Sequence, residues 1–154
     1  MKRIIFGIAF MALLSSNASA QLYDVGLGIR AAPSFGFSVK VFADQENALE
    51  LILHRRNNIR YRITALYERH NHFSSNWYFF YGFGGTLNII TDSDIQGQLG
   101  IGVDGILGLE YVAETIPISL GIDYKPGFNI IGASNSNNFF WDELGFSIRI
   151  LLGS

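Results

Sequence analysis

The sequence predicts an all-β protein, an eight-stranded antiparallel up-and-down transmembrane β-barrel. Apolar and other residues alternate with a period of two along most of the chain after Gln21, which is typical of β-strands. Short breaks rich in turn-forming residues separate the alternating segments, which favours antiparallel hairpins. The charged residues and most glycines share one face of the strands, and the large apolar residues share the other.

Residues 1–20 are expected to form a secretory signal peptide that is cleaved, leaving the barrel domain at 21–154. The segment begins with Lys2 and Arg3, continues with the apolar run Ile4–Leu14 and ends in Ala-Ser-Ala. The run is too short to span a bilayer as a helix. The alternative is a short buried helix. Loss of the two basic residues takes the net charge of the chain from −2 to −4.

Composition limits the classes of function that remain. A chain of 154 residues suits one domain, and a formal net charge of −2 without a basic cluster beside stacking aromatics argues against nucleic acid as a partner. The sequence has no cysteine, which excludes disulfides, thiolate metal sites and lipid attachment at an N-terminal cysteine.

Eight segments carry the alternation in chain order. We expect strands over 22–31, 34–42, 47–56, 59–70, 77–90, 97–113, 116–131 and 139–152. Turn-forming residues separate them at 33–34, 43–47, 57–58, 71–76, 91–97, 113–117 and 132–138. Because every break is short, each strand is expected to pair with the next one along the chain.

The parity of each strand assigns its charged residues to one face. They are Asp24, Arg30, Lys40, Glu50, Arg56, Arg60, Arg62, Glu68, Asp104, Glu110, Asp123, Lys125, Glu143 and Arg149. Seven are acidic and seven are basic. Buried charges must be paired, so we expect these residues to form a ladder of ion pairs that plugs the lumen.

Three observations predict that the charged face points inward. More than thirty large apolar residues would overfill the interior of an eight-stranded barrel. Glycine on the charged face leaves room for long ionic side chains to cross a narrow lumen. Aromatic residues gather towards strand ends, as membrane interfaces require: Tyr23, Tyr61, Tyr67, Trp77, Tyr111, Tyr124 and Trp141. The alternative is a soluble, secreted lipocalin-like barrel that carries a small apolar ligand.

An exported barrel with a continuous apolar exterior is expected in an outer membrane of the Gram-negative type. Lipid cannot satisfy backbone donors and acceptors, so a β protein must close on itself to span a bilayer. The expected partners are outer-membrane lipid and, during biogenesis, the barrel-insertion machinery, and the barrel is expected to be a monomer.

The end of the chain looks like the C-terminal insertion signal of outer-membrane barrels. Glu143, Gly145, Ile148 and Ile150 fill its polar, glycine and hydrophobic positions. An aromatic residue usually ends that signal, whereas Ile150 is followed here by Leu-Leu-Gly-Ser.

A wider resemblance is carried by six segments: NALELIL (47–53), LYERHN (66–71), WYFFYGFGG (77–85), GVDGILGLEY (102–111), IPISLGIDYKPGFNIIG (116–132) and LGFSIRI (144–150). On these segments the chain resembles a family of small, mostly uncharacterised Gram-negative outer-membrane β-barrel proteins. The resemblance implies an eight-stranded barrel with its N-terminus in the periplasm, and it brings no catalytic residue and no ligand.

No catalytic, cofactor or metal site is expected. The segment 100–105 fits the dinucleotide pattern G-x-G-x-x-G, but the alternation continues as strand where that site needs a helix. His70 and His72 lack a third metal ligand, and Asn71 and Phe73 beside them suggest a turn. Asp92-Ser93-Asp94 lacks the further ligands of a calcium site. No spacing of Ser, His and acid singles out a hydrolase triad.

The function expected from these observations is a structural role in the envelope, without catalysis. One alternative is a binding or adhesion module that uses the loops 91–97 and 132–138. Loops this short leave little area for recognition of a partner.

Overall fold

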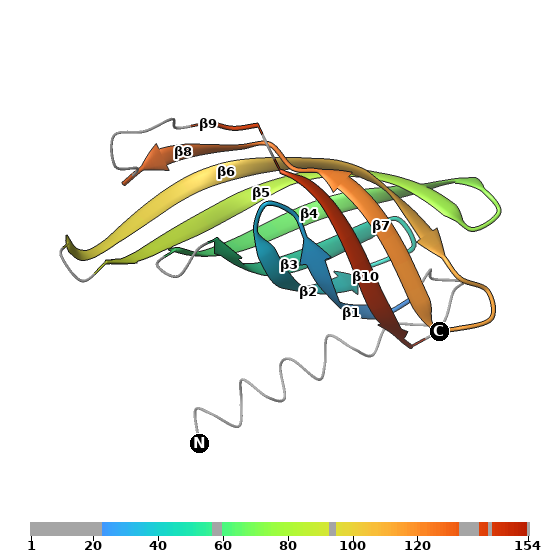
Figure 1. Cartoon of the computed structure of the whole chain (residues 1–154). Coiled ribbons are helices and arrows are strands. Elements are labelled where there is room, and N and C mark those ends of the chain that lie inside the picture. Colours follow the sequence, from blue (N-terminus) through green and yellow to red (C-terminus); the bar gives the residue numbers. More distant parts are fainter. Residues whose placement is uncertain (1–22, 57–59, 93–94, 133–138, 142, 154) are drawn as a thin grey trace, which may run out of the picture.

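The computed structural model describes residues 23–56, 60–92, 95–132, 139–141 and 143–153, and it is all-β (Figure 1). The strands are β1 Val25–Ala31, β2 Phe35–Phe42, β3 Asn47–Arg56, β4 Arg60–Ser74, β5 Trp77–Asp92, β6 Ile95–Val112, β7 Ile118–Tyr124, β8 Gly127–Ile131, β9 Phe139–Phe140 and β10 Leu144–Leu152. No helix in the described part of the chain is long and apolar enough to cross a membrane.

The strands close into a ring of eight positions. Neighbours are antiparallel in the order β1, β2, β3, β4, β5, β6, β7, β10, and β10 pairs with β1 to complete the cylinder. The short strand β8 continues β7 along β6, and the two-residue strand β9 pairs with β8. The prediction of an eight-stranded antiparallel up-and-down barrel is therefore confirmed.

Two expected strands are interrupted. The strand expected over 116–131 divides into β7 and β8 at Pro126, which has no N–H to donate to a ladder. The Pro126 carbonyl still accepts a hydrogen bond from the Gly105 N–H (2.9 Å). The strand expected over 139–152 likewise divides into β9 and β10.

The hairpin between β4 and β5 is longer than expected. The polar residues at 71–76 predict a turn, and this prediction is wrong for most of the segment. Asn71 pairs with Phe79 and His72 pairs with Tyr78, so backbone pairing continues to a bulge before Ser74. The turn itself is confined to the residues around Ser75, whose φ of 33° is left-handed.

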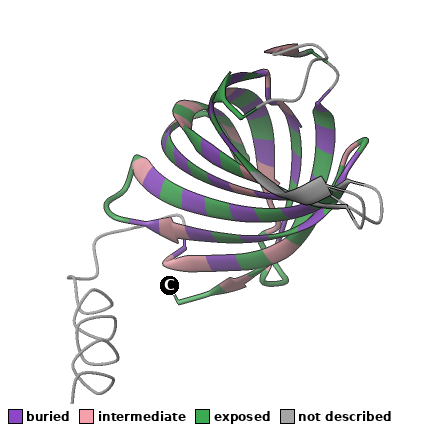
Figure 2. Ribbon diagram, turned by 90° about the vertical axis from the view of Figure 1, so that its left-hand side faces the viewer, coloured by how far each residue is buried: buried purple, intermediate pink, exposed green. Residues whose placement is uncertain are grey.

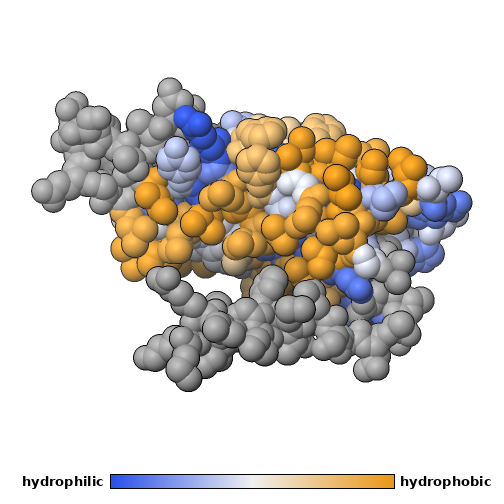
Figure 3. All heavy atoms as spheres, turned by 90° about the horizontal axis from the view of Figure 1, so that it is seen from below, coloured by the Kyte–Doolittle hydropathy of each residue, from blue (hydrophilic) through white to orange (hydrophobic). Residues whose placement is uncertain are grey.

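The register places the apolar residues outside, as the parity argument predicts. Buried and exposed residues alternate along the strands (Figure 2), and Phe37 and Phe83 are 62% and 71% exposed. Figure 3 shows the resulting apolar surface over the side of the barrel in view. The alternative of a soluble barrel with an apolar interior is wrong, because Arg62 and Glu110 are buried instead. A closed sheet with this exterior is a transmembrane β-barrel.

One aromatic residue departs from the expected girdle. Tyr23 is 1% exposed and lies inside the barrel end, where its ring packs edge-on against Phe42 at 4.8 Å. Its hydroxyl donates a hydrogen bond to Glu110 (3.0 Å), so a polar partner in the lumen accounts for its inward position.

A charge on the outer band should destabilise the barrel. Leu51 lies at the middle of β3 and is 51% exposed. Leu51→Arg is expected to lower the free energy of unfolding in phospholipid vesicles by about 2–4 kcal/mol, since Arg near the bilayer midplane loses its hydration. Urea titration followed by tryptophan fluorescence measures the change.

The matched control is Phe73→Arg, at the end of the long β4–β5 hairpin, where the side chain is 58% exposed. Its free energy of unfolding is expected to stay within about 1 kcal/mol of the parent value, because the cost of a charge falls towards the interface. Equal losses at both positions would contradict the assignment of the exterior to lipid.

Candidate functional site

The interior of the barrel concentrates the ionisable side chains of the chain. The two ends of the cylinder differ: the first and last described residues lie at one end, where the N–H of Asp24 donates a hydrogen bond to the carbonyl of Gly153 (3.4 Å). We call this the terminal end, and the other the distal end. The interior charges form two clusters, one towards each end.

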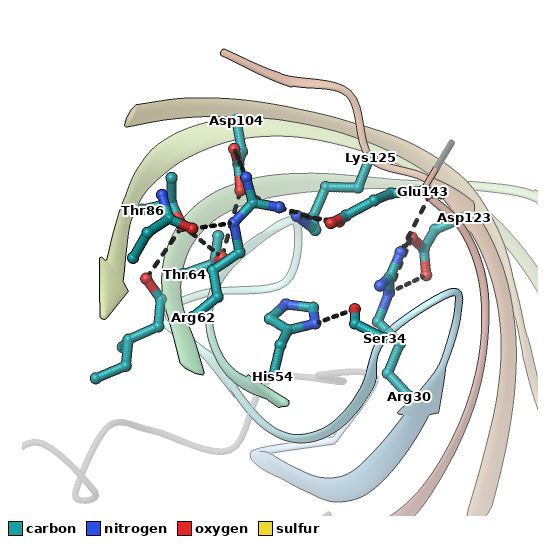
Figure 4. A network of polar contacts seen from close by, with 12 residues as sticks. Arg30, Ser34, His54, Arg62, Thr64, Thr86, Asp104, Asp123, Lys125 and Glu143 are labelled. Carbon is teal, nitrogen blue, oxygen red and sulfur yellow. Dashed lines mark hydrogen bonds and ion pairs between the residues drawn. The ribbon is translucent and has the colours of Figure 1, made fainter. Parts of the chain in front are cut away.

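The distal cluster contains Arg30, Arg62, Asp104, Asp123, Lys125 and Glu143 (Figure 4). Arg30 and Asp123 form its tightest pair, with Nη2 2.5 Å from Oδ1 and Nε 3.1 Å from both carboxylate oxygens. Both side chains are almost completely buried, so this charge-assisted contact is shielded from water.

The other four members of the distal cluster form a chain of alternating charge. Arg62 Nη1 lies 2.6 Å from Glu143 Oε1, and the other oxygen of Glu143 is 2.5 Å from Lys125 Nζ. Lys125 Nζ also lies 3.0 Å from Asp104 Oδ2, while Asp104 Oδ1 is 3.9 Å from Arg62 Nη2. Three cations face three carboxylates, so the distal cluster is balanced.

Uncharged side chains add hydrogen bonds to this cluster. The Thr64 hydroxyl donates to Asp104 (3.3 Å) and pairs with the hydroxyl of Thr86 (3.1 Å). Arg62 Nε donates to Asn88 (3.0 Å), whose amide donates to Asn129 (2.9 Å). Such partners reduce the cost of burying the ions.

The terminal cluster contains Lys40, Glu50, Glu68, Glu110 and Arg149. Arg149 Nη2 lies 2.6 Å from Glu50 Oε1, and Nη1 lies 3.6 Å from Glu110 Oε1. Lys40 Nζ lies 2.8 Å from Glu68 and 3.6 Å from Glu50. Two cations therefore face three carboxylates.

His70 lies between two carboxylates of the terminal cluster. Its Nε2 is 3.1 Å from Glu68 Oε2, and its Nδ1 is 3.6 Å from Glu110 Oε2. The imidazole stacks on Phe80 at 5.0 Å. Two cations face three carboxylates in this cluster, so the imidazole of His70 stands where carboxylates outnumber cations.

An apolar layer lies between the two clusters. It consists of Ile52, Leu66, Phe80 and Ile106, each no more than 4% exposed and in mutual contact. Leu66 stands on β4 between Thr64 and Glu68, so the layer separates distal from terminal ions. These four residues are missed when the inner face is assigned from its charged residues alone. The signal that could have identified them is their parity, which is that of the inward-facing residues on each strand.

Most, but not all, of the fourteen residues expected in the charge network belong to an ion-pair cluster in the structure. Eleven of its members belong to the two clusters described above. Asp24 is half-buried at the terminal end and forms no ion pair with the residues that the structure describes. The side chains of Arg56 and Arg60 lie outside the described residues.

The residues of the C-terminal signal divide between the two faces. Ile148 and Ile150 point outward and are 43% and 59% exposed. Gly145 faces the lumen, where a Cβ would lie 2.5 Å from Arg30 Cζ, so glycine there leaves room for the guanidinium group.

The histidines fall in three separate environments. His54 is buried in the distal half, where Nδ1 and the Ser34 hydroxyl are 3.1 Å apart. His70 belongs to the terminal half, and His72 is exposed on the hairpin, with Nε2 donating to the carbonyl of Ser75 (2.6 Å). Over the described ranges, no three His, Asp or Glu side chains are grouped in a way that could hold a metal ion.

Of the remaining motif candidates, only the G-x-G-x-x-G segment is described in full by the structure. The G-x-G-x-x-G segment lies wholly inside β6, which runs on as strand to Val112. Ser93 and Asp94 of the acidic turn lie outside the described residues, as does 133–138 of the proposed binding loop.

Comparison with known proteins supports the fold. No protein-family model and no curated protein sequence matches the chain. The solved structure of Neisserial surface protein A is similar with a TM-score of 0.58 and 16% sequence identity, over 84% of this chain and 94% of that one. At this identity the similarity is one of fold, and it agrees with the closed barrel described above.

Proposed function

We propose that the protein is an integral outer-membrane barrel with a structural role in the envelope and no catalytic activity. One observation carries the proposal: the closed sheet turns its apolar residues outward and buries paired charges within. This arrangement suits a lipid bilayer around the barrel and a filled core inside it. The proposal extends to a place in the resembled family of small Gram-negative barrels, to a cleaved signal peptide and to a monomeric state.

The filled interior supports a lumen plugged by charge. Any path from one end to the other must cross the layer of Ile52, Leu66, Phe80 and Ile106 as well as both ionic clusters. Barrels that pass solutes freely have many more strands. We therefore propose a rigid shell rather than a channel.

We also propose that the strand β10 carries the insertion signal, through Gly145, Ile148 and Ile150. The outward position of the two isoleucines supports contact with the insertion machinery during assembly.

Envelope fractionation tests the proposal. The protein is expected in the outer-membrane fraction, and its band on electrophoresis is expected to shift when the sample is heated, because a closed barrel resists detergent at room temperature. Purified protein in planar bilayers is expected to give no steady conductance. Recovery in the soluble periplasmic fraction would contradict the location, and steady conductance would contradict the plugged lumen.

A further inference from the structure

The terminal end of the barrel contains a cavity of about 590 Å³ that the envelope role does not use. The β2–β3 turn, the β4–β5 hairpin and the end of β6 surround it. Pockets for small molecules commonly enclose about 300–1,000 Å³, so the cavity can hold a ligand of modest size.

The wall of the cavity is acidic and carries hydrogen-bond acceptors. Glu46 and Glu114 contribute carboxylates, and Asn71 and Asn76 contribute amides. The described residues that line the cavity include no Lys or Arg. Arg69 lies outside it and is 2.6 Å from Glu46, so part of the charge of Glu46 is already compensated and Glu114 is the more available carboxylate.

The floor of the cavity adds to this negative character. His70 lines it and is only 2% exposed, and its Nδ1 makes no hydrogen bond but lies 3.6 Å from Glu110 Oε2. Behind the imidazole stands the terminal cluster, with three carboxylates to two cations. A cation in the cavity would therefore approach a region that lacks one positive charge.

Apolar and aromatic groups occupy another part of the wall. Val112 and Ala113 line the cavity beside Tyr78, whose ring is 5.1 Å from that of His72. Aromatic faces attract organic cations, and small apolar side chains suit the methylene groups between their charges.

We propose that this cavity binds a small organic cation, an aliphatic amine whose ammonium group is held by Glu114 and the floor at His70. The methylene stem would lie along Val112, Ala113 and Tyr78. The cavity combines open space with a wall and floor in which carboxylates outnumber cations.

Titration of the full chain in zwitterionic detergent with spermidine tests the proposal. Isothermal calorimetry at low ionic strength is expected to show saturable binding that weakens as salt is raised. Glu114→Gln, in an exposed turn, is expected to weaken binding about fivefold, the effect of losing one partly exposed ion pair. The heat-shifted band of each variant verifies that the barrel has folded.

Asp44→Asn is the matched control. Asp44 lies in the same turn as Glu46 but does not line the cavity. Hydrogen bonds from the Asn47 side chain and from the Glu46 and Asn47 N–H groups lower its pKa, so it is charged at neutral pH. Its replacement is expected to change the affinity less than about twofold.

Two results would overturn the proposal. One is the absence of saturable binding up to millimolar spermidine, and the other is an equal loss of affinity in the Glu114 and Asp44 variants, which marks general attraction to an acidic surface. Either result leaves the envelope role intact, since that role is tested by location and by mobility on electrophoresis.

Discussion

Replacement of Arg149 by methionine is expected to lower the free energy of unfolding by about 3–5 kcal/mol. Arg149 is 1% exposed and is the cation that contacts both Glu50 and Glu110. Without it, Lys40 alone faces three buried carboxylates. Urea unfolding in phospholipid vesicles, followed by tryptophan fluorescence, measures the loss.

Two further variants separate charge balance from simple loss of contacts. Glu110→Gln removes the carboxylate in excess and keeps the shape of the side chain, so it is expected to cost less than Arg149→Met. Arg69→Met breaks a half-exposed pair with Glu46 and is expected to cost no more than about 1 kcal/mol. An Arg149 variant as stable as the parent would refute the view that the ion pairs support the interior.

Gly84→Ala is expected to lower the free energy of unfolding by about 3 kcal/mol or more and to reduce the yield of folded barrel. A Cβ at Gly84 would overlap the backbone carbonyl oxygen of Ala65 and lie 2.8 Å from Leu66 Cα. Because these are backbone atoms of the paired strand β4, the clash cannot be relieved by rotation of a side chain. The proportion of heat-shifted protein and the urea midpoint report the change.

The neighbouring residue Gly85 supplies the control on the same strand. It points outward, and the nearest atom to an added Cβ is the Gly102 carbonyl oxygen at 3.9 Å. Gly85→Ala is therefore expected to leave stability unchanged or to raise it by up to about 1 kcal/mol, because alanine restricts the unfolded chain. A similar loss in both variants would show that inward crowding is not the cause.

The orientation of the strands could be predicted from sequence because a strand has only two faces. A shift of one residue would move every side chain to the other face, so the alternation of Leu109 with Glu110 sufficed to place one outside and the other inside. Closure followed from the need of a membrane sheet to have no free edge. These arguments depend on parity alone and need no knowledge of partners.

The partners inside the lumen could not be predicted in the same way. Arg149 and Glu50 are 99 residues apart, and Arg30 and Asp123 are 93 apart. Which ions meet depends on the stagger of all the strands around the ring, and short turns of uncertain length set that stagger. The position of Phe80 was obscured for a different reason: it stands in a run of aromatic residues, Trp77–Tyr81, in which parity is hard to read.

The seam between β1 and β10 determines when the cylinder can be completed. Val25–Ala31 pairs with Phe146–Leu152, so β1 gains its second neighbour only after β10 has been made. Until then, β1 presents an unpaired edge, and unpaired strand edges invite aggregation. Contacts so distant along the chain also fold slowly. The cylinder therefore closes in a late step, in which the two strands farthest apart along the described chain come together.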